Sequence, residues 1–470
     1  MKRSASRALQ SGAMALGLGL QAMLVTPTTA QAAKPEVRGT WMTTTANDAI
    51  ASPEKTAASM KRLREIGLNA VYVECWKNGY TEFPSETMDR LVGVPMKING
   101  APPELQRDLL QETVIEAHRN RLIHIAWFEY GFMAAYKATR NELRKQYSQW
   151  MTRTSEGGLV GDQNPFVWMN PLRPESRDLL MSIVKEAVLK YDLDGVQLDD
   201  RIAWPVTMGY DPYTIKVYKR EHDGAAPPRD PRDPAWIKWR ADKVTEFAQR
   251  FHAELKAMRP NLIVSISPAI WDWCYENYAC DWKRWSHAGL MDEYIPQIYR
   301  TTFDRVREDW PAQLAAAGSD RRGDLVAGLR LVGSGPETPW DDYRRKIELV
   351  RASNAGGHCH WFSRGVLEVY PDELQAFYDV ENHGHAPYPH LPEDWRPAPI
   401  VATPDGEGGF VADDVPAGHY RIIAMIDGRW ARVATQAHEG GPWHYAHEGE
   451  AKPTAVELLV DRRLTPPLGE

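Results

Sequence analysis

Eight short segments rich in β-branched and aromatic residues alternate along the chain with segments of helical periodicity, and this alternation restricts the possible folds most. Repeated βα units build either an open doubly wound sheet or a closed barrel. No glycine-rich phosphate loop follows the first segment, and eight units over about 340 residues favour a (β/α)8 TIM barrel. The predicted strands are Val37 to Met42, Ala70 to Glu74, Leu122 to Glu129, Gly195 to Asp199, Leu262 to Ser267, Glu293 to Ile298, Leu325 to Leu329 and Gly357 to Phe362.

Two of the intervening helices have clear start and stop signals. Ser52 can cap a helix that begins at Pro53, and Gly67 can end it. The segment Pro174 to Tyr191 places a row of Leu, Ile, Val and Ala side chains on one face. Both segments are therefore predicted to cover the barrel as amphipathic helices.

The N-terminus has the pattern of an export signal. Lys2, Arg3 and Arg7 precede a mostly apolar run, and small residues follow near Ala30. The apolar run is shorter than the roughly 20 residues that a spanning helix needs, which disfavours an uncleaved anchor. We predict that residues 1–32 are a cleaved signal peptide and that the mature protein is exported, periplasmic or secreted, without a membrane span.

The C-terminal region has a different pattern. Residues 35–380 contain the predicted barrel, and a linker rich in Pro and His occupies residues 381–398. Residues 399–470 contain strand-like segments separated by Gly and Asp turns, which predicts a small β-sandwich. This sandwich either binds glycan or packs against the barrel.

Composition narrows the ligand class. The chain has 56 Lys and Arg against 63 Asp and Glu, a net charge of −7, which argues against nucleic acid or an anionic lipid surface as partner. It has 18 Trp and 19 Tyr but only 10 Phe, a bias toward rings with a polar handle. Sugar-binding clefts use such rings, so the expected partner is a glycan substrate; the sequence leaves the oligomeric state open.

Three consecutive predicted strands end in acidic residues: Glu74, Glu129 and Asp199. In a TIM barrel the chemistry takes place at the C-terminal ends of the strands. Glycoside hydrolysis by the common route needs two carboxyl groups across the scissile bond. The acidic strand ends therefore predict a glycoside hydrolase.

Roles for the carboxylates follow from strand alternation and local composition. Asp199 is predicted to point into the barrel mouth as nucleophile or electrostatic stabiliser, with Asp200 starting the loop and Arg201 keeping one carboxylate ionised. The alternative is a structural Asp–Arg pair at the rim. Aromatic neighbours are expected to raise the pKa of Glu129, as a general acid requires. Glu74 is a second acid candidate or binds a sugar hydroxyl.

Other polar and aromatic residues lie near predicted strand ends, where they can stack on sugar rings or bind hydroxyl groups. Trp361 is expected to be the exception among them because it lies within a strand, and Asp272 is a reserve acid. The predicted substrate-binding residues are Trp127, Trp168, Asn170, Gln197, Arg201, Trp204, Trp271, Asp272, Trp273, Gln297, Tyr299 and His360.

Four cysteines are present. Cys274 and Cys280 are six positions apart in one segment, and in an oxidising compartment they are predicted to form a disulfide. No set of Cys and His residues has the spacing of a zinc site. Neither a metal nor another cofactor is therefore expected.

The order of several motifs resembles the bacterial glycosyl-hydrolase-like family 10, a group of largely exported barrel proteins. The resemblance covers about residues 35 to 380 and implies a barrel hydrolase acting on envelope or extracellular glycans, such as peptidoglycan strands or exopolysaccharide. Asp199 and Asp200 match the two aspartates that the family carries at strand four. The motifs are Arg38-Gly39-Thr40-Trp41, Ala126-Trp127-Phe128-Glu129-Tyr130-Gly131-Phe132, Trp168-Met169-Asn170-Pro171, Asp194 to Arg201, Ile266-Ser267-Pro268 and Ile295-Pro296-Gln297-Ile298-Tyr299.

At the end of strand two this chain departs from the family pattern. It has Glu74-Cys75-Trp76 where many relatives carry Gln and Arg, so substrate contacts there are expected to differ. The competing reading of the whole chain is a carbohydrate-binding protein without catalysis, because a fold alone does not confer turnover. A deacetylase is disfavoured by the lack of a metal-binding His and Asp set, and a lyase would be recognised by an unsaturated product.

Overall fold

The structure is a computed structural model that describes residues 32–137, 139–161 and 165–463. All but the last residue of the predicted signal peptide lie outside these ranges. None of the helices in the described ranges combines the length and the apolar content of a membrane span.

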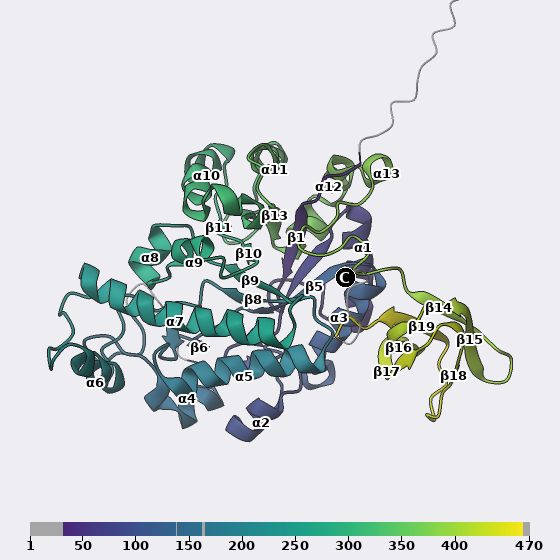
Figure 1. Cartoon of the computed structure of the whole chain (residues 1–470), viewed down its shortest axis with the longest axis horizontal. Helices are drawn as coiled ribbons and strands as arrows, with labels where there is room; N and C mark the ends of the chain where they lie inside the picture. Colours follow the sequence, from purple (N-terminus) through teal and green to yellow (C-terminus); the bar gives the residue numbers. More distant parts are fainter. Residues whose placement is uncertain (1–31, 138, 162–164, 464–470) are drawn as a thin grey trace, which may run out of the picture. The chain divides into compact units, whose positions relative to one another are not determined.

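Nine parallel strands form one sheet in the order β10-β9-β8-β5-β2-β1-β13-β12-β11 (Figure 1). The strands are β1 Val37–Met42, β2 Ala70–Glu74, β5 Ile123–Phe128, β8 Gly195–Asp199, β9 Ile263–Ser267, β10 Glu293–Tyr294, β11 Gln297–Ile298, β12 Val326–Arg330 and β13 Gly357–Trp361. Each of the eight predicted strands corresponds to one of these strands or, in one case, to two.

Strands β10 and β11 are two pieces of one strand, separated by Ile295 and Pro296. Proline has no N–H to donate, which explains the break. Strand β10 pairs with β9, and β11 pairs with β12, so the last strands of the sheet join through this interrupted strand. The sheet therefore closes on itself with eight strand positions, and the predicted (β/α)8 barrel is confirmed.

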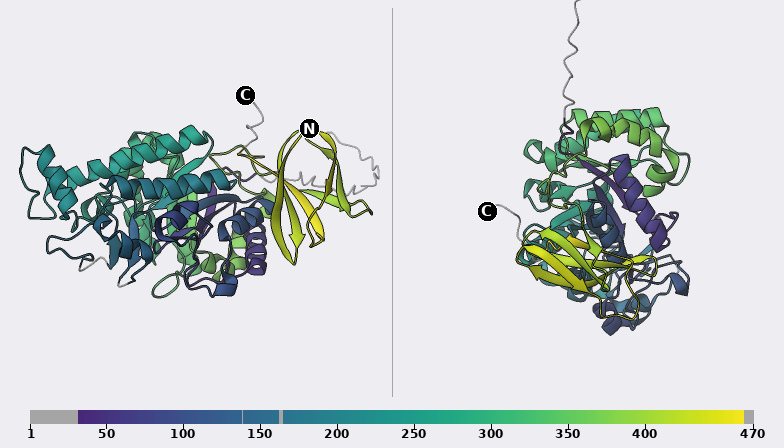
Figure 2. Two further views of the ribbon diagram at one scale, coloured as in Figure 1. Left: turned by 90° about the horizontal axis from the view of Figure 1, so that it is seen from below. Right: turned by 90° about the vertical axis from the view of Figure 1, so that its right-hand side faces the viewer.

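Helices follow the barrel strands and cover the sheet (Figures 1 and 2). Helix α1 begins and ends as predicted: the Ser52 side chain accepts from the Lys55 N–H, and Gly67 ends the helix in a left-handed conformation. The helices of the barrel region are α1 Pro53–Ile66, α2 Glu86–Val92, α3 Leu109–Arg119, α4 Glu142–Gln146, α5 Pro174–Lys190, α6 Pro212–Glu221, α7 Pro234–Met258, α8 Trp273–Tyr278, α9 Trp282–His287, α10 Phe303–Ala317, α11 Trp340–Ala352, α12 Pro371–Tyr378 and α13 Val380–His383.

Short elements interrupt the βα alternation. Two hairpins follow β2 and β5: β3 Trp76–Lys77 with β4 Tyr80–Thr81, and β6 Met133–Tyr136 with β7 Phe166–Trp168. Four further turns of helix are Pro103–Leu105, Ser148–Trp150, Ser319–Asp324 and Gly365–Val369. The hairpins lie on the loops at the C-terminal ends of the strands, the face where a barrel carries its site.

Alternating side chains give the barrel two cores. One face of β8 places Val196 and Leu198 in the cluster between sheet and helices. The interior cluster contains inward residues of other strands, among them Trp41, Tyr72 and Trp127. Odd-numbered residues of β5, β8, β9 and β13 therefore point inward, as do even-numbered residues of β2.

The segment after the barrel closes the interior at the N-terminal ends of the strands. Tyr388, Leu391 and Trp395 belong to the interior cluster. The Tyr388 hydroxyl donates to Glu293 at the start of β10, at 2.8 Å, and the Trp395 indole N–H donates to Asp194, one residue before β8, at 2.6 Å. This end of the barrel is therefore filled with side chains.

The C-terminal region forms one antiparallel sheet of six strands in the order β17-β16-β19-β14-β15-β18 (Figure 2). Buried residues of both halves of this sheet make a single cluster, so the predicted sandwich is one sheet whose halves enclose a core. Ile423 and Leu459 pack instead against Ile115 of α3. The strands are β14 Ile400–Pro404, β15 Gly409–Val415, β16 Gly418–Ile426, β17 Arg429–His438, β18 Gly441–Ala446 and β19 Ala455–Val460.

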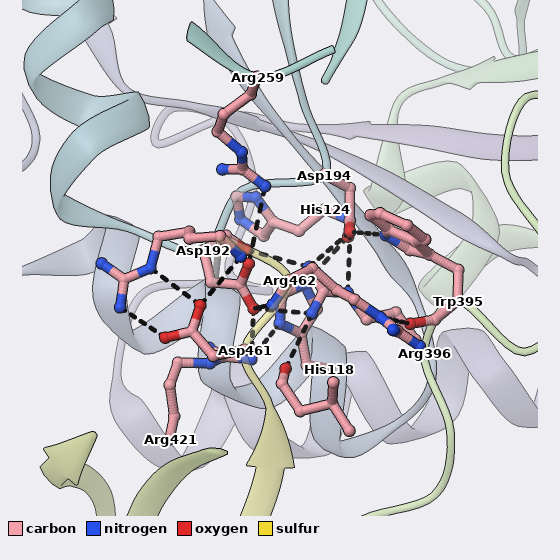
Figure 3. A network of polar contacts seen from close by, with 12 residues as sticks. His118, His124, Asp192, Asp194, Arg259, Trp395, Arg396, Arg421, Asp461 and Arg462 are labelled. Atoms are coloured by element: carbon pink, nitrogen blue, oxygen red, sulfur yellow. Dashed lines mark hydrogen bonds and ion pairs between the residues drawn. The ribbon is translucent and has the colours of Figure 1, made fainter. Parts of the chain in front are cut away.

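A buried polar network joins this sheet to the barrel (Figure 3). The Arg396 guanidinium donates to Asp192 at 2.7 Å and to Asp194 at 2.8 Å, both just before β8. Arg421 of β16 pairs with the same Asp192 at 3.2 Å and donates to Nδ1 of His118 at 2.6 Å. Nε2 of His118 must then carry the proton that it donates to Asp194, at 3.0 Å. The barrel and the sheet thus share these charged side chains.

Candidate active site

Asp199 ends β8 and points into the barrel mouth, as its alternation with Gln197 predicts. One carboxylate oxygen accepts from the Ser267 hydroxyl at 2.7 Å and from the Gln297 amide at 2.6 Å, and the other pairs with Arg201. Burial raises the pKa of Asp199; Arg201 opposes this shift, and the neighbouring Asp200 adds to it. Asp199 is thus oriented by side chains from β9, from β11 and from the loop after β8.

Asp200 and Arg201 begin the loop after β8. Arg201 forms ion pairs with both Asp199 and Asp200. Burial raises the pKa of Asp200 despite the Arg201 charge, and Glu129 raises it further. The Asp200 side chain is 24% exposed and that of Asp199 only 2%, so Asp200 is the more accessible of the two carboxyl groups.

Glu74 ends β2 and is fully buried beside Lys77. The Lys77 ammonium lies 2.7 Å from one Glu74 oxygen and 3.5 Å from Glu129. The Thr44 hydroxyl and N–H both donate to the other Glu74 oxygen. Burial raises the pKa of Glu74 to about 7; Lys77 opposes the shift and Glu129 adds to it.

The pKa of Glu129 is lowered, which corrects the prediction that aromatic burial raises it. Burial alone would raise it, but the charges of Lys77 and Arg201 outweigh that effect. The sequence shows the aromatic neighbours but not the two cations, because these are brought to Glu129 by the loops after β2 and β8. Glu129 is therefore the ionised member of the cluster.

The carboxyl groups of this cluster outnumber its cations. Besides the four described above, Glu82 is buried with one carboxyl oxygen 3.0 Å from the Thr44 hydroxyl oxygen, and burial together with Glu74 raises its pKa. Because Lys77 and Arg201 cannot neutralise all of the carboxylates, some of them retain protons near neutral pH. The site therefore places ionised and protonated carboxyl groups side by side. Its ionisable members are Glu74, Lys77, Glu82, Glu129, Asp199, Asp200 and Arg201.

Aromatic rings surround this cluster on the inner side of the barrel. Trp127 is buried among Trp41 and Trp361, with ring centroids 6.4 and 6.1 Å away, and its indole N–H has no acceptor among the described residues. Tyr299 stacks on Trp361 at 5.2 Å. Trp361 was expected not to contribute to the site because it lies within a strand, but it packs with Trp127 and Tyr299 at the barrel mouth.

His360 lies on the opposite face of β13, so its predicted place at the mouth is wrong. Its ring nitrogens bond to the hydroxyl groups of Tyr343 on α11, at 2.5 Å, and Tyr378 on α12, at 2.9 Å. Since successive side chains of a strand alternate, the inward position of Trp361 turns His360 outward.

Gln197 faces the interior one layer below Asp199. Its amide oxygen accepts from the Trp41 indole at 2.7 Å, and its nitrogen donates to Ser265 at 2.9 Å. Gln197 is fully buried. It therefore supports the mouth from below rather than facing substrate.

Three predicted substrate-binding residues belong to the packing of the insertions instead. Trp168 is 1% exposed, and Trp204 is fully buried with its indole donating to Thr152 at 3.3 Å. The Asn170 amide donates to Asp211 at 3.0 Å. Burial in this way leaves these side chains no surface to offer a sugar.

The loop after β9 holds two further candidates at its surface. Trp271 is partly buried against Tyr275 and Trp282, at 5.7 and 5.8 Å. Asp272 is exposed and precedes α8. Within the part of the chain that the structure describes, neither side chain makes a hydrogen bond, ion pair or ring contact with the carboxylate cluster.

All four cysteines of the described chain are free thiols, and the predicted Cys274–Cys280 disulfide is absent. Cys274 lies within α8 and Cys280 follows the end of that helix, and the Cys274 thiol contacts the Cys280 carbonyl oxygen at 3.5 Å. In the described ranges no group of three or more His, Cys, Asp or Glu side chains is arranged to hold a metal ion.

Sequence reasoning missed Lys77, Ser267 and Glu82 as members of the site. Lys77 lies three residues after Glu74, on the short hairpin that follows β2. Ser267 ends β9 with the same inward parity as Asp199, with which it is paired in register. Ser267 could have been predicted as a site residue because it is the last residue of a barrel strand, whereas no sequence signal indicates Glu82.

Comparison with known proteins gives relatives among bacterial glycosyl hydrolases. Glycosyl hydrolase YngK of Bacillus subtilis (strain 168) is 24% identical over 375 residues, which span 68% of this chain and 67% of that protein. Glycosyl hydrolase DigH of Escherichia coli (strain K12) is 26% identical over 341 residues, which span 63% of this chain and 70% of that protein.

Among solved structures, the PgaB (BpsB) glycoside hydrolase domain from Bordetella bronchiseptica matches with a TM-score of 0.56 and 15% identity. The match covers 74% of this chain and 99% of that domain, and it concerns the fold. The family described as Glycosyl hydrolase-like 10 matches residues 36–329, more than half of the chain. The chain therefore belongs to the glycosyl hydrolase-like 10 family.

Proposed function

We propose that this protein is an exported hydrolase of O-glycosidic bonds in a bacterial envelope or extracellular polysaccharide, either peptidoglycan glycan strands or exopolysaccharide. One observation carries the proposal: Glu129, whose pKa is lowered, and Asp199 and Asp200, whose pKa values burial raises, meet around Arg201 at the C-terminal end of the barrel. Glycoside hydrolysis needs one carboxylic acid and one carboxylate on opposite sides of the bond. The family membership and the fold support the same reaction class.

The pKa directions suggest how the work is divided. Asp200 has a raised pKa and the more accessible side chain, so it is placed to protonate the leaving-group oxygen. Glu129 is the ionised partner that stabilises positive charge on the sugar or activates water. Asp199, held by Ser267, Gln297 and Arg201, fixes the position of Arg201 beside Asp200. No metal or other cofactor takes part in this proposal.

The test is hydrolysis by the purified mature protein in oxygen-18 water, with peptidoglycan strands and exopolysaccharides as substrates. Product mass spectra should show label in a new reducing end, and Asp199→Asn should abolish it. Asp178→Asn, which changes an exposed carboxylate on α5, should have no effect. Binding without any labelled product would support a carbohydrate-binding protein instead.

The proposed acid is tested with two leaving groups. Asp200→Asn should slow hydrolysis of the natural glycan by about a hundredfold or more, the usual contribution of a general acid. With an aryl glycoside, whose phenolate leaves without protonation, the same variant should lose much less of its hydrolysis rate. Equal losses on both substrates would contradict the assignment of Asp200.

A further inference from the structure

The loops after β8 and β9 line a hollow at the C-terminal ends of the strands, on the same face as the carboxylate cluster. It has a volume of about 710 Å³ and is bounded by residues 154–161 of the insertion, 205–207 after β8, 229–232, and 273–278 of α8. Two backbone hydrogen bonds hold its floor together: Trp204 N–H to the Tyr278 carbonyl, and Val206 N–H to the Asn277 carbonyl. Its size is that of a ligand pocket.

This hollow is next to the carboxylates. Trp204, three residues after Arg201 in the loop after β8, donates its N–H to the Tyr278 carbonyl at 2.8 Å, and Tyr278 lines the hollow. From Tyr278 the lining continues outward to Trp273, whose ring centroid is 5.3 Å from that of Tyr278. A chain that lies across Asp200 can therefore continue toward Trp273.

The hollow contains exposed apolar surface that packing does not explain. Trp273 is 48% exposed and Val160 is 44% exposed, and both line it. They are two of the five exposed large apolar side chains of the described residues, and Trp273 is the one tryptophan among them. An exposed indole face is suited to stacking on a sugar ring.

The polar groups of the lining are also suited to a glycan. Thr207 is exposed in the lining and offers its hydroxyl group to a sugar. The Asn277 side chain is fixed beside it, because its amide donates to the Trp273 carbonyl at 2.9 Å and accepts from Arg232 at 3.0 Å. Arg229 also lines the hollow, and among the described residues its guanidinium makes no ion pair and no side-chain hydrogen bond, so its donors remain available there. The site thus combines one stacking ring with several hydrogen-bonding groups.

We infer that this hollow is a subsite for a polysaccharide chain several sugars away from the bond that is cut, with Trp273 as its stacking residue. The inference rests on the proposed function and extends it. Because a distal subsite is filled only by a chain that continues past the cleavage point, the enzyme cuts within long chains and prefers them to short oligosaccharides.

The experiment compares kcat/KM on size-fractionated glycan strands, long against tetrasaccharide, for wild type and Trp273→Ala. The preference for long strands should fall about tenfold in the variant, through KM, as loss of one stacking contact implies. Trp273→Phe should keep most of the preference. Leu189→Ala is the matched control, since Leu189 is an exposed apolar residue on α5, 69% exposed, at the end of the helix that leads into β8. An unchanged length preference in Trp273→Ala would overturn the inference.

Binding separates this inference from the proposed function. In the Asp199→Asn background, long strands of peptidoglycan glycan or exopolysaccharide should bind about tenfold more tightly than in the Asp199→Asn, Trp273→Ala double variant. If wild type cleaves no polymer but this difference remains, the proposed function fails and the subsite stands. Equal binding of long strands by the two variants, or binding by neither, overturns the subsite.

Discussion

Lys77 determines the protonation of two glutamates. Its ammonium group lies between Glu74 and Glu129, and both carboxylates raise its own pKa although burial opposes this. The same cation is the first electrostatic cause of the lowered pKa of Glu129. A residue without any role in the sequence analysis thus controls which carboxyl group is ionised.

Lys77→Met should therefore raise the pKa of Glu129. Since the proposed mechanism needs ionised Glu129, the acid limb of the pH profile of kcat/KM should move to higher pH by about one unit or more. Lys77→Arg should largely restore the wild-type profile. Lys55→Met removes a charge from an exposed pair with Asp48 and is the control. An acid limb that stays in place in Lys77→Met would contradict this role.

At the scale of elements, the site depends on contact between the loop after β5 and the loop after β8. Gly131 has a φ of +44°, and a Cβ atom there would lie 2.7 Å from the Arg201 carbonyl oxygen. The Phe132 N–H donates to the same carbonyl at 3.1 Å. This contact sets the distance between the strand end that carries Glu129 and the one that carries Asp199.

Gly131→Ala should push the two loops apart. We expect a loss of about tenfold or more in kcat/KM and a destabilisation of about 1–3 kcal/mol, from backbone strain and the clash. Gly93→Ala provides the comparison, because Gly93 also has a positive φ, +72°, but no atom within 4 Å of the added Cβ. Melting temperatures and kcat/KM are measured for both variants. A kcat/KM of Gly131→Ala equal to that of the wild type would contradict the role of this loop contact.

Much of the barrel could be predicted because strand signals and caps are local. The bounds of β1, β2 and β8 agree with the sequence prediction to the residue, and Ser52 and Gly67 delimit α1 as expected. The mistakes arose where the inward parity of a strand was unknown: Cys359 and Trp361 point inward, and His360 does not. Strand alternation predicts that successive side chains point to opposite faces of the sheet. Only packing against distant parts of the chain determines which of the two faces is the barrel interior.

Other features were out of reach for a related reason. Trp168 lies on β7, in the insertion after β5, and Trp204 lies in the loop after β8. Both rings are buried by packing between these segments, which the sequence did not indicate. The protonation of Glu129 depends on cations from the loops after two other strands. Proximity in space created by different βα units carries no signal in a single sequence.

At the scale of the whole molecule, the buried network of Figure 3 makes the union of barrel and C-terminal sheet dependent on pH. Burial, with help from Arg396, lowers the pKa of His118 to about 4, from an ordinary value of 6.5. The unfolded chain binds a proton at His118 as pH falls below 6.5, while the folded protein does not until about pH 4. Stability from this residue is therefore present above pH 6.5 and lost as pH falls toward 4.

His118→Gln should weaken this pH dependence. Between pH 7 and 4 the wild type should lose up to about 3 kcal/mol of unfolding free energy through His118, and the variant should lack that part of the slope. His444→Gln, at an exposed histidine of β18, should leave the slope unchanged. Denaturant unfolding at a series of pH values measures the difference, and parallel curves for wild type and His118→Gln would contradict the prediction.

The barrel interior is closed by Tyr388, Leu391 and Trp395, which come after the last barrel strand in the chain. A ribosome releases these residues only after all eight strand positions have been synthesised. Until this segment is in place, the interior of the barrel is open to water at one end. A segment that follows all eight strand positions in the chain therefore completes the core that the strands enclose.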